Sequence, residues 1–255
     1  MSIFSRLFLL ILLGLALYLN GFWSNTAEIS WLTPVVVKVY PINADERLET
    51  QRYINTLTSL QFSDLTLFFN REAQKYRLAL KNPIKVSLQP QPKTSPPVPP
   101  DNPSILENIL WGARMRYWVW SEEADLEAEK TIRVYLRLYS ADSENLIRHS
   151  LGLQKGLIGV VNGIAEAEQQ GLNNLIAAHE LLHTLGATDK YDVKTNWPIW
   201  PIGYAEPTKE PLLPQSAAEI MGGRVQISSS IALLPPNLDF AVIGAATAIE
   251  IGWMK

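Results

Sequence analysis

The sequence predicts an α/β (α+β) domain with a mixed sheet, preceded by a short apolar segment. Blocks of apolar residues follow in the order strand, helix, strand, helix, strand, strand, helix, which is typical of helices packed on a sheet. The chain has 255 residues, 47% of them hydrophobic, and this suffices for one domain with a full core. We therefore expect an N-terminal segment over residues 1–27 and a single domain over residues 28–255.

The N-terminal segment contains a long uncharged run. No charge occurs from Leu7 to Ala27, a span of 21 residues. At about 1.5 Å per residue, a helix of this length can cross a hydrocarbon core of about 30 Å. Arg6 precedes the run and Glu28 follows it, which predicts a cytosolic N-terminus and a periplasmic or extracellular domain. A cleaved signal peptide is the alternative, because the 13-residue apolar core ending at Leu19 also fits one.

The first half of the domain predicts a strand, a helical region and a second strand. Residues 35–40 are β-branched and bounded by prolines, as strands often are. Residues 44–77 have helical periodicity with a break near Ser63, and residues 84–88 predict a short strand. The apolar stripe of the helical region consists of Leu48, Tyr53, Ile54, Leu57 and Leu60.

A proline-rich loop and a helix come next. Residues 90–103 contain seven prolines, which exclude a helix or an interior strand and predict a stiff surface loop. Residues 104–123 predict a helix, with Ser104 and Glu107 at the positions of a capping box. Its three tryptophans, Trp111, Trp118 and Trp120, are expected in the core.

The second half predicts two strands and two helices. Residues 131–139 alternate apolar with polar side chains, which predicts a half-buried strand, and residues 156–163 predict a short strand flanked by glycines. Residues 171–185 predict a helix. The next 50 residues are rich in proline, and residues 239–254 predict an apolar final helix whose ten-residue uncharged stretch is too short to span a bilayer.

Composition excludes several classes of site. The chain has no cysteine, so it cannot form thiolate zinc sites, iron–sulfur clusters or a thiol nucleophile. Its net charge is −3, and no basic stripe of a nucleic-acid binder is present. Of its three histidines, two fall in the five-residue segment His179-Glu-Leu-Leu-His183.

This segment has the geometry of a metal site. On a helix, His179 and His183 lie about 40° apart on one face, so that both imidazoles can bind one zinc ion. Glu180 lies at the edge of that face, where its carboxylate can reach a water on the metal. Gly186 can end the helix in a left-handed conformation and let Asp189 return as the third ligand.

Other third ligands stay open at this point. A distant glutamate would complete the site in a thermolysin-like arrangement, and Glu206, Glu210 and Glu219 are the candidates. Asp192 and His149 are further candidates, although His149 lies in a polar stretch typical of a surface histidine.

Residues 179–189 resemble the extended signature of the metzincin metallopeptidases. Asp189 in place of the usual third histidine, with Tyr191 just after it, resembles the snapalysin-like variant. Residues 219–223, Glu-Ile-Met-Gly-Gly, look like the methionine turn that metzincins carry beneath the zinc. The resemblance is close over about 15 residues, and over residues 130–255 it extends to the order of the elements.

The resemblance implies a metzincin-like zincin fold with an active-site helix, a methionine turn and a C-terminal helix. It also implies one catalytic Zn²⁺ on His179, His183 and Asp189, with Glu180 as general base. The strand over residues 156–163 would be the sheet edge that binds an extended substrate. Many metzincins have a tyrosine where Gly223 stands, so a tyrosine that assists catalysis would have to be Tyr191 or Tyr204.

The sequence therefore predicts a membrane-anchored zinc metalloendopeptidase that acts on a protein or peptide substrate. The alternative is a non-catalytic, membrane-tethered sensory or binding domain on the same fold. The presence of Glu180 favours the enzyme, because a domain that only binds has no use for a general base.

Overall fold

The computed structural model describes residues 29–100, 104–122, 131–142, 151–153 and 157–254. Within these ranges, no helix combines the length and the apolar character needed to cross a bilayer. The predicted N-terminal span, residues 1–27, lies outside the described residues and stays a prediction.

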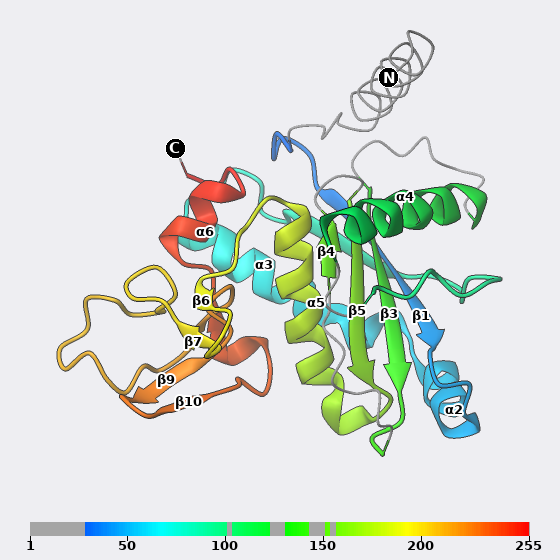
Figure 1. Cartoon of the computed structure of the whole chain (residues 1–255). Coiled ribbons are helices and arrows are strands. Elements are labelled where there is room, and N and C mark those ends of the chain that lie inside the picture. Colours follow the sequence, from blue (N-terminus) through cyan, green and yellow to red (C-terminus); the bar gives the residue numbers. More distant parts are fainter. Residues whose placement is uncertain (1–28, 101–103, 123–130, 143–150, 154–156, 255) are drawn as a thin grey trace, which may run out of the picture.

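A five-stranded sheet forms the centre of the molecule, in the order β2-β1-β3-β5-β4 (Figure 1). Four strands run parallel and β4 runs antiparallel to β5, so the predicted mixed α/β sheet is confirmed. The strands are β1 (Val35–Asn43), β2 (Ile84–Leu88), β3 (Thr131–Tyr139), β4 (Leu151–Leu153) and β5 (Ile158–Ile164).

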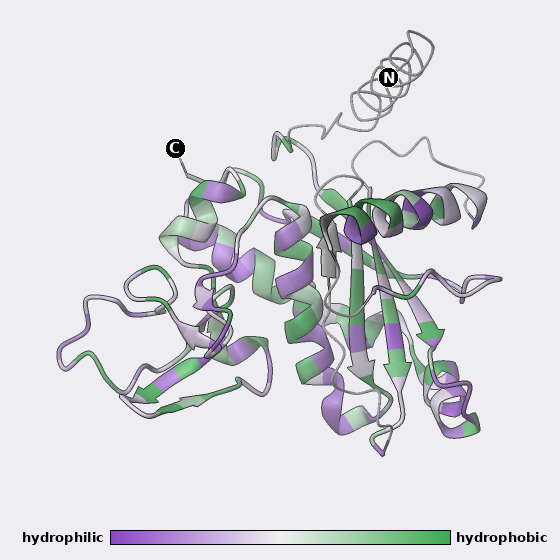
Figure 2. Ribbon diagram, viewed as in Figure 1, coloured by the Kyte–Doolittle hydropathy of each residue, from purple (hydrophilic) through white to green (hydrophobic). Residues whose placement is uncertain are grey.

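Helices cover both faces of the sheet. On one face, apolar side chains of α2 (Leu48–Thr56), α3 (Ser63–Lys75) and α5 (Gln170–Thr184) join the sheet in the larger core cluster. On the other face, α4 (Ile105–Glu122) packs on the sheet in a second, smaller cluster. Apolar residues accordingly dominate the central strands and alternate with polar residues along the helices (Figure 2).

The prediction of a half-buried β3 is wrong. Every residue of β3 is buried, including Arg133 and Arg137 at the positions predicted to face solvent. The cause is α4, which covers this face: the Trp118 ring packs edge-on against Tyr135, with centroids 4.9 Å apart. Alternation in a sequence predicts one polar face, but it does not show whether another element covers that face.

The prediction that residues 156–163 form the edge of the sheet is also wrong. Strand β5 exists, but it lies between β3 and β4, and Gly152 and Leu153 of β4 pair with Gly159 and Ile158. The edge of the sheet on this side is β4. With three residues, β4 is too short for its periodicity to be recognised in the sequence.

The helical region over residues 44–77 divides where a break was predicted. Helix α2 ends at Thr56, a single 3₁₀ turn, η1 (Ser59–Phe62), follows, and α3 begins at Ser63. The predicted apolar stripe is correct for Ile54 and Leu57, which are buried, and wrong for Leu48 and Leu60, which are exposed. Leu48 lies in α2 with Ile54 but six residues before it, so the two side chains point about 120° apart, and Leu60 lies in η1, after α2 has ended.

Helix α4 begins with the predicted capping box. The Ser104 hydroxyl accepts a hydrogen bond from the Glu107 amide, and the Glu107 carboxylate accepts one from the Ser104 amide. Trp111 and Trp118 are buried as predicted, but Trp120 is 60% exposed. Residues 90–100 of the proline-rich loop contain no helix or strand, as predicted.

The segment after α5 contains short strands in three pairs. The 3₁₀ turn η3 (Ala167–Gln169) comes directly before α5, and the 3₁₀ turn η4 (Leu238–Phe240) comes directly before the last strand. The predicted final helix is shorter than expected: only α6 (Ala245–Glu250) is α-helical, because Gly244 precedes it in an extended conformation. The paired strands are β6 (Tyr191–Asp192) with β7 (Trp197–Pro198), β8 (Ala218–Glu219) with β11 (Ala241–Val242), and β9 (Val225–Ser228) with β10 (Ile231–Leu233).

Candidate metal centre

Helix α5 carries the motif and is fixed in the core along one side. Leu175, Leu181 and Leu182 are buried in the larger core cluster. Near its N-terminus, the Asn173 side chain donates to the Ile164 carbonyl and accepts from the Ile164 amide. These contacts tie the helix to the end of β5, so the opposite face, with the histidines, has one orientation relative to the sheet.

The C-terminus of α5 turns as the glycine predicts. Gly186 has a φ of 106°, which a residue with a Cβ rarely adopts. The Gly186 amide donates to His183 O, and the Ala187 amide donates to Leu182 O. These two bonds define a Schellman motif, which reverses the chain immediately after the second histidine.

Both imidazoles are held through their Nδ1 atoms. His179 Nδ1 lies 2.9 Å from the carbonyl oxygen of Ile220, and His183 Nδ1 lies 2.8 Å from that of Ala187. Because a carbonyl oxygen only accepts, each Nδ1 must carry a hydrogen and donate it. In the neutral imidazole the lone pair is then on Nε2, as a metal ligand requires.

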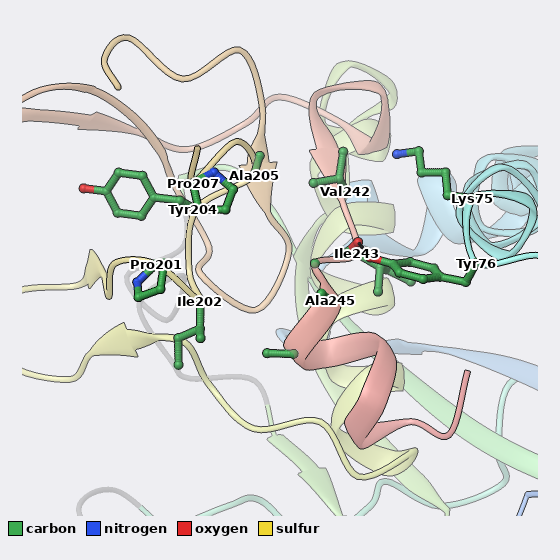
Figure 3. A pocket seen from close by; sticks show the side chains of 12 residues that line it. Lys75, Tyr76, Pro201, Ile202, Tyr204, Ala205, Pro207, Val242, Ile243 and Ala245 are labelled. Carbon is green, nitrogen blue, oxygen red and sulfur yellow. Dashed lines mark hydrogen bonds between the residues drawn. The ribbon is translucent and has the colours of Figure 1, made fainter. Parts of the chain in front are cut away.

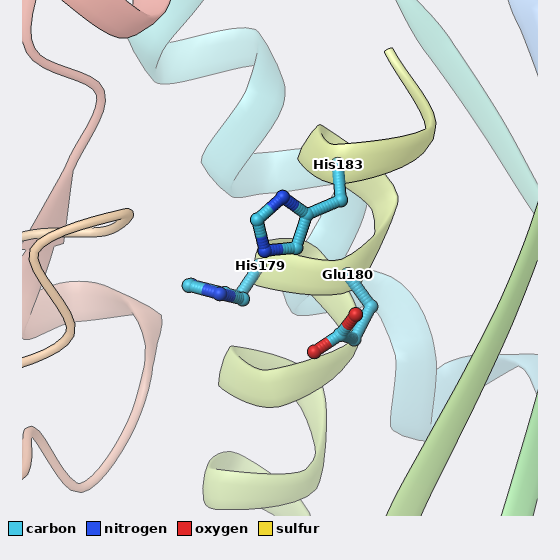
Figure 4. A group of neighbouring side chains, drawn as sticks. All are labelled: His179, Glu180 and His183. Carbon is cyan, nitrogen blue, oxygen red and sulfur yellow. The ribbon is translucent and has the colours of Figure 1, made fainter. Parts of the chain in front are cut away.

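His179, Glu180 and His183 each offer one ligand atom, and these three atoms all lie within 4.8 Å of one another (Figure 4). This group could therefore hold a metal ion. Asp189 reaches the same place from the loop after α5. Its Oδ1 atom lies 3.2 Å from His179 Nε2 and 3.1 Å from His183 Nε2. The structure thus brings together the four residues that the sequence singled out, while their role as ligands and base stays a prediction.

The donor set fits a tetrahedral cation. A carboxylate oxygen and two imidazole lone pairs at these distances repel one another unless a proton or a metal ion lies among them. Neighbouring ligand atoms around a tetrahedral zinc are about 3.3 Å apart when the bonds are about 2.0–2.1 Å long. The distances from Asp189 Oδ1 to the two histidines are close to this separation.

Without a metal, the charges of the cluster stabilise one another. Burial alone lowers the pKa of His179, but the hydrogen bond with Asp189 and the charge of Glu180 outweigh burial and raise it. Burial raises the pKa of Asp189, yet the hydrogen bonds from His179 and His183 outweigh it and hold that pKa well below its usual range. Protons and a metal ion therefore compete for this cluster.

Glu180 is suited to move a proton. Its side chain is buried, and its Oε2 atom has no hydrogen-bond partner within the described part of the chain. Burial raises the pKa of this carboxyl, and the two histidines act against that rise. A buried carboxyl of raised pKa is suited to take up a proton and to release it again.

Residues 219–223 form a turn that supports the first histidine. Ile220 supplies the carbonyl for His179 Nδ1, and Met221 is fully buried in the core cluster. The buried Glu219 carboxylate accepts hydrogen bonds from the Gly222 amide, the Gly244 amide and the Thr247 hydroxyl. This carboxylate thus joins the turn to the start of α6 and is engaged away from the histidines.

The other candidates for a third ligand are hydrogen-bonded to other groups, are exposed in a loop, or lie outside the described residues. Asp192 is exposed, and its carboxylate accepts from the amides of Lys194 and Thr195. Glu206 accepts from the Ser216 amide, Glu210 lies in the same exposed loop region, and His149 lies outside the described residues.

Of the two tyrosines considered, Tyr191 lies beside the cluster. Its ring centroid is 6.5 Å from that of His179, and a methyl group at Gly223 would lie 3.8 Å from its ring. Burial first, and then the charge of Asp189, raise the pKa of Tyr191 to about 12. Tyr204 instead lines a pocket of about 450 Å³ with Tyr76, where none of the four clustered residues contributes (Figure 3).

The sequence did not identify the residues that hold the Asp189 loop. Glu250 of α6 accepts hydrogen bonds from the Thr188 amide and hydroxyl and from Lys190 Nζ at 2.6 Å. Thr188 and Lys190 flank Asp189, and Lys190 is almost completely buried. In the sequence, Glu250 stands out only as a charged residue in the apolar C-terminal segment. This does not indicate that its partner is Lys190, 60 residues away.

Replacing Glu250 with alanine is expected to weaken metal binding by about 10–100-fold, as for other residues that orient ligands. It is also expected to lower the free energy of unfolding by roughly 1–3 kcal/mol, because the buried Lys190 loses its charged partner. Isothermal titration with metal and denaturant unfolding measure the two effects. The control is Glu166→Ala, which removes an exposed glutamate without changing either quantity; equal metal affinity in both variants would contradict the role of Glu250.

Comparison with models of known protein families finds no match, and comparison with curated protein sequences finds none either. The likeness to metzincins therefore rests on the motif and on the geometry of the cluster.

Proposed function

We propose that this chain is a zinc-dependent metallopeptidase of the metzincin type. The observation that carries the proposal is the position of Asp189 Oδ1 within 3.2 Å of both histidine Nε2 atoms. Two imidazoles and one carboxylate, with both Nδ1 atoms donating to carbonyls, form a donor set suited to zinc. Three protein ligands leave one tetrahedral position for water or substrate, as catalytic sites require.

His179, His183 and Asp189 would hold the metal, and Glu180 would act as general base. Zinc supplies Lewis acidity there and lowers the pKa of a bound water toward about 7. Glu180 Oε2, which is buried and free of other hydrogen bonds in the described chain, takes a proton from the attacking water. The same oxygen then passes this proton to the leaving amine nitrogen.

Tyr191 would assist as a neutral donor. Its pKa of about 12 keeps the phenol protonated at neutral pH. Its position between the Asp189 loop and Gly223 places it at the edge of the cluster, where a phenol can donate a hydrogen bond to the substrate carbonyl oxygen.

The substrate would bind as an added strand on β4, the edge strand, in place of the strand predicted from the sequence. Gly152 of β4 pairs with Gly159 of β5, and a methyl at Gly159 would lie 3.9 Å from Glu180 Cβ. Glu180 is therefore next to β5, one strand in from the sheet edge. Backbone hydrogen bonds along an edge hold an extended peptide independently of its sequence.

One side chain of the substrate would enter the apolar pocket beside His179. This pocket has a volume of about 170 Å³, and Gly223 forms part of its wall. Its size and lining favour an aliphatic side chain next to the scissile bond. Its other lining residues are Leu175, Ile176, Ala218, Ile220, Leu234 and Pro235.

Replacing Leu234 with alanine is expected to widen the pocket and to shift preference toward larger side chains. The ratio of kcat/KM for a phenylalanine peptide to that for a leucine peptide should rise about tenfold, since one or two methylene groups in a pocket are worth this much. The matched control is Leu233→Ala, because Leu233 is equally exposed but does not line the pocket. An identical ratio in both variants would exclude this pocket as a specificity site.

The proposal is tested by metal analysis together with proteolysis. The purified chain should contain one zinc per molecule and should cleave an unstructured protein. A chelator should stop the cleavage, and added zinc should restore it. Zinc binding without any cleavage would favour the alternative, a sensory or binding domain, although such a domain has no use for a buried carboxylate oxygen that has no hydrogen-bond partner among the described residues.

We also propose that the domain is exported and held at the membrane by residues 1–27. The support is the uncharged run from Leu7 to Ala27 and the charge difference across it. Secretion after cleavage of a signal peptide is the second possibility. N-terminal sequencing of the protein purified from membranes separates the two.

A further inference from the structure

Helix α4 has two apolar faces, and in the described part of the chain only one of them packs against other elements. The inner face packs against the sheet through Trp111, Met115, Trp118 and Val119, all buried. The outer face is also apolar but is exposed to solvent. Leu106, Ile109, Leu110, Tyr117 and Trp120 on this face have exposed fractions between 49% and 65%.

The exposed apolar residues form one continuous stripe. At 100° per residue, Leu106, Ile109, Leu110, Ala113, Tyr117 and Trp120 all fall within an arc of about 100°. The stripe runs from Leu106 in the first turn of α4 to Trp120 in the last, a length of about 21 Å. The exposed charged residues Glu107 and Arg114 lie beside the stripe and not within it.

Such a stripe is not needed for folding. A surface helix normally turns one apolar face to the core and a polar face to water, and a contiguous exposed apolar patch indicates a binding surface. The stripe has an aliphatic part near Leu106 and an aromatic part with Tyr117 and Trp120. Tyrosine and tryptophan combine an apolar ring with a polar group, which suits the boundary between acyl chains and headgroups.

We propose that this stripe lies on the surface of a lipid bilayer, with its side chains inserted at the headgroup boundary. The chain before the described residues supports lipid as the occupant. Its 21-residue uncharged run ends at Ala27, two positions before Ile29, where the description begins. If this run is in the membrane, the domain starts at the lipid surface. In Figure 1, the start of the described chain and α4 lie at the same end of the sheet.

This proposal rests on the proposed membrane anchor and not on peptidase activity. It also orients the molecule: α5 packs on the opposite face of the sheet from α4, and its histidines point away from the sheet. The metal cluster would then face the aqueous phase while the domain lies on the lipid.

Site-directed spin labelling tests this contact directly, because the chain has no cysteine of its own. The full chain with Ala113→Cys, in the middle of the stripe, is labelled with a nitroxide and reconstituted into phosphatidylcholine vesicles. The control is Arg52→Cys, an exposed position on α2 at the other face of the sheet. The accessibility of each label to oxygen and to a polar nickel complex is measured by electron paramagnetic resonance.

The label at position 113 is expected to be several-fold less accessible to the nickel complex than the label at position 52, and more accessible to oxygen. Adding Ile109→Glu and Trp120→Glu should remove this difference while the circular dichroism spectrum stays unchanged. Equal accessibility at positions 113 and 52, or failure of the full chain to enter vesicles, would overturn the proposal.

Two further outcomes would identify another occupant and would also overturn the proposal. Low accessibility to both reagents would mean that another segment of the chain covers the stripe. Spin–spin broadening that grows with the protein-to-lipid ratio would mean that a second copy covers it. None of these readouts depends on zinc or on hydrolysis, so this proposal and the proposed activity can fail independently.

Discussion

Replacing Glu180 with glutamine is expected to lower kcat/KM for peptide hydrolysis by about 10²–10⁴-fold, the contribution typical of a general base. Glutamine has nearly the same size and shape as glutamate, so the packing next to β5 is retained. Its amide cannot take a proton from water. The substitution removes from proton transfer the buried Oε2 atom, which has no hydrogen-bond partner in the ranges that the structure describes.

Metal content separates this explanation from others. The Glu180→Gln variant should bind one zinc with unchanged affinity, because the three proposed ligands are intact. The control is Glu168→Gln, the same chemical change at an exposed residue, which should keep full activity. Full hydrolysis by Glu180→Gln would reject the mechanism, and loss of zinc would identify Glu180 as a ligand.

Replacing Asp189 with alanine is expected to weaken zinc binding by more than about 100-fold. Changes to residues that only orient ligands cost about 10–100-fold, and the loss of a ligand should cost more. The variant also removes the oxygen that lies 3.1 Å and 3.2 Å from the two histidine Nε2 atoms. Competition titration with a chromophoric chelator measures the affinity of both proteins.

The matched control is Asp192→Ala. Asp192 is an exposed carboxylate three residues further along, and its oxygen caps a turn through the Lys194 and Thr195 amides. Its removal should leave zinc affinity unchanged. If Asp189→Ala kept the stoichiometry and affinity of the unmodified protein, the third ligand would have to be sought among other residues.

Much of the candidate site could be predicted because its geometry is local. His179 and His183 are four positions apart, so with 3.6 residues per turn they lie one above the other on the same face of the helix. Gly186 adopts the left-handed conformation expected of it, and the Schellman motif it forms brings Asp189 back within six residues of the helix. The capping box of α4 was predictable for the same reason.

The errors arose wherever a distant segment decides the environment. The sequence of β3 predicts a polar face, yet α4 covers that face and Arg133 is buried. The strand at residues 158–164 was expected at an edge, but β4 pairs with it. The error at Trp120 is of another kind: it was expected in the core, but helical periodicity alone places it in the outer stripe of α4, where it is exposed.

By itself, the sequence determined the order of the longer helices and strands, the helix with its two histidines and Glu180, and the turn that returns Asp189. These depend on propensity, periodicity and capping within a few residues. Only the tertiary structure decided that Glu250 holds both neighbours of Asp189, that the Ile220 carbonyl orients His179, and that no described segment covers the outer apolar face of α4. These contacts join residues 41 to 62 positions apart, so they depend on how helices and strands pack, and no local pattern encodes that packing.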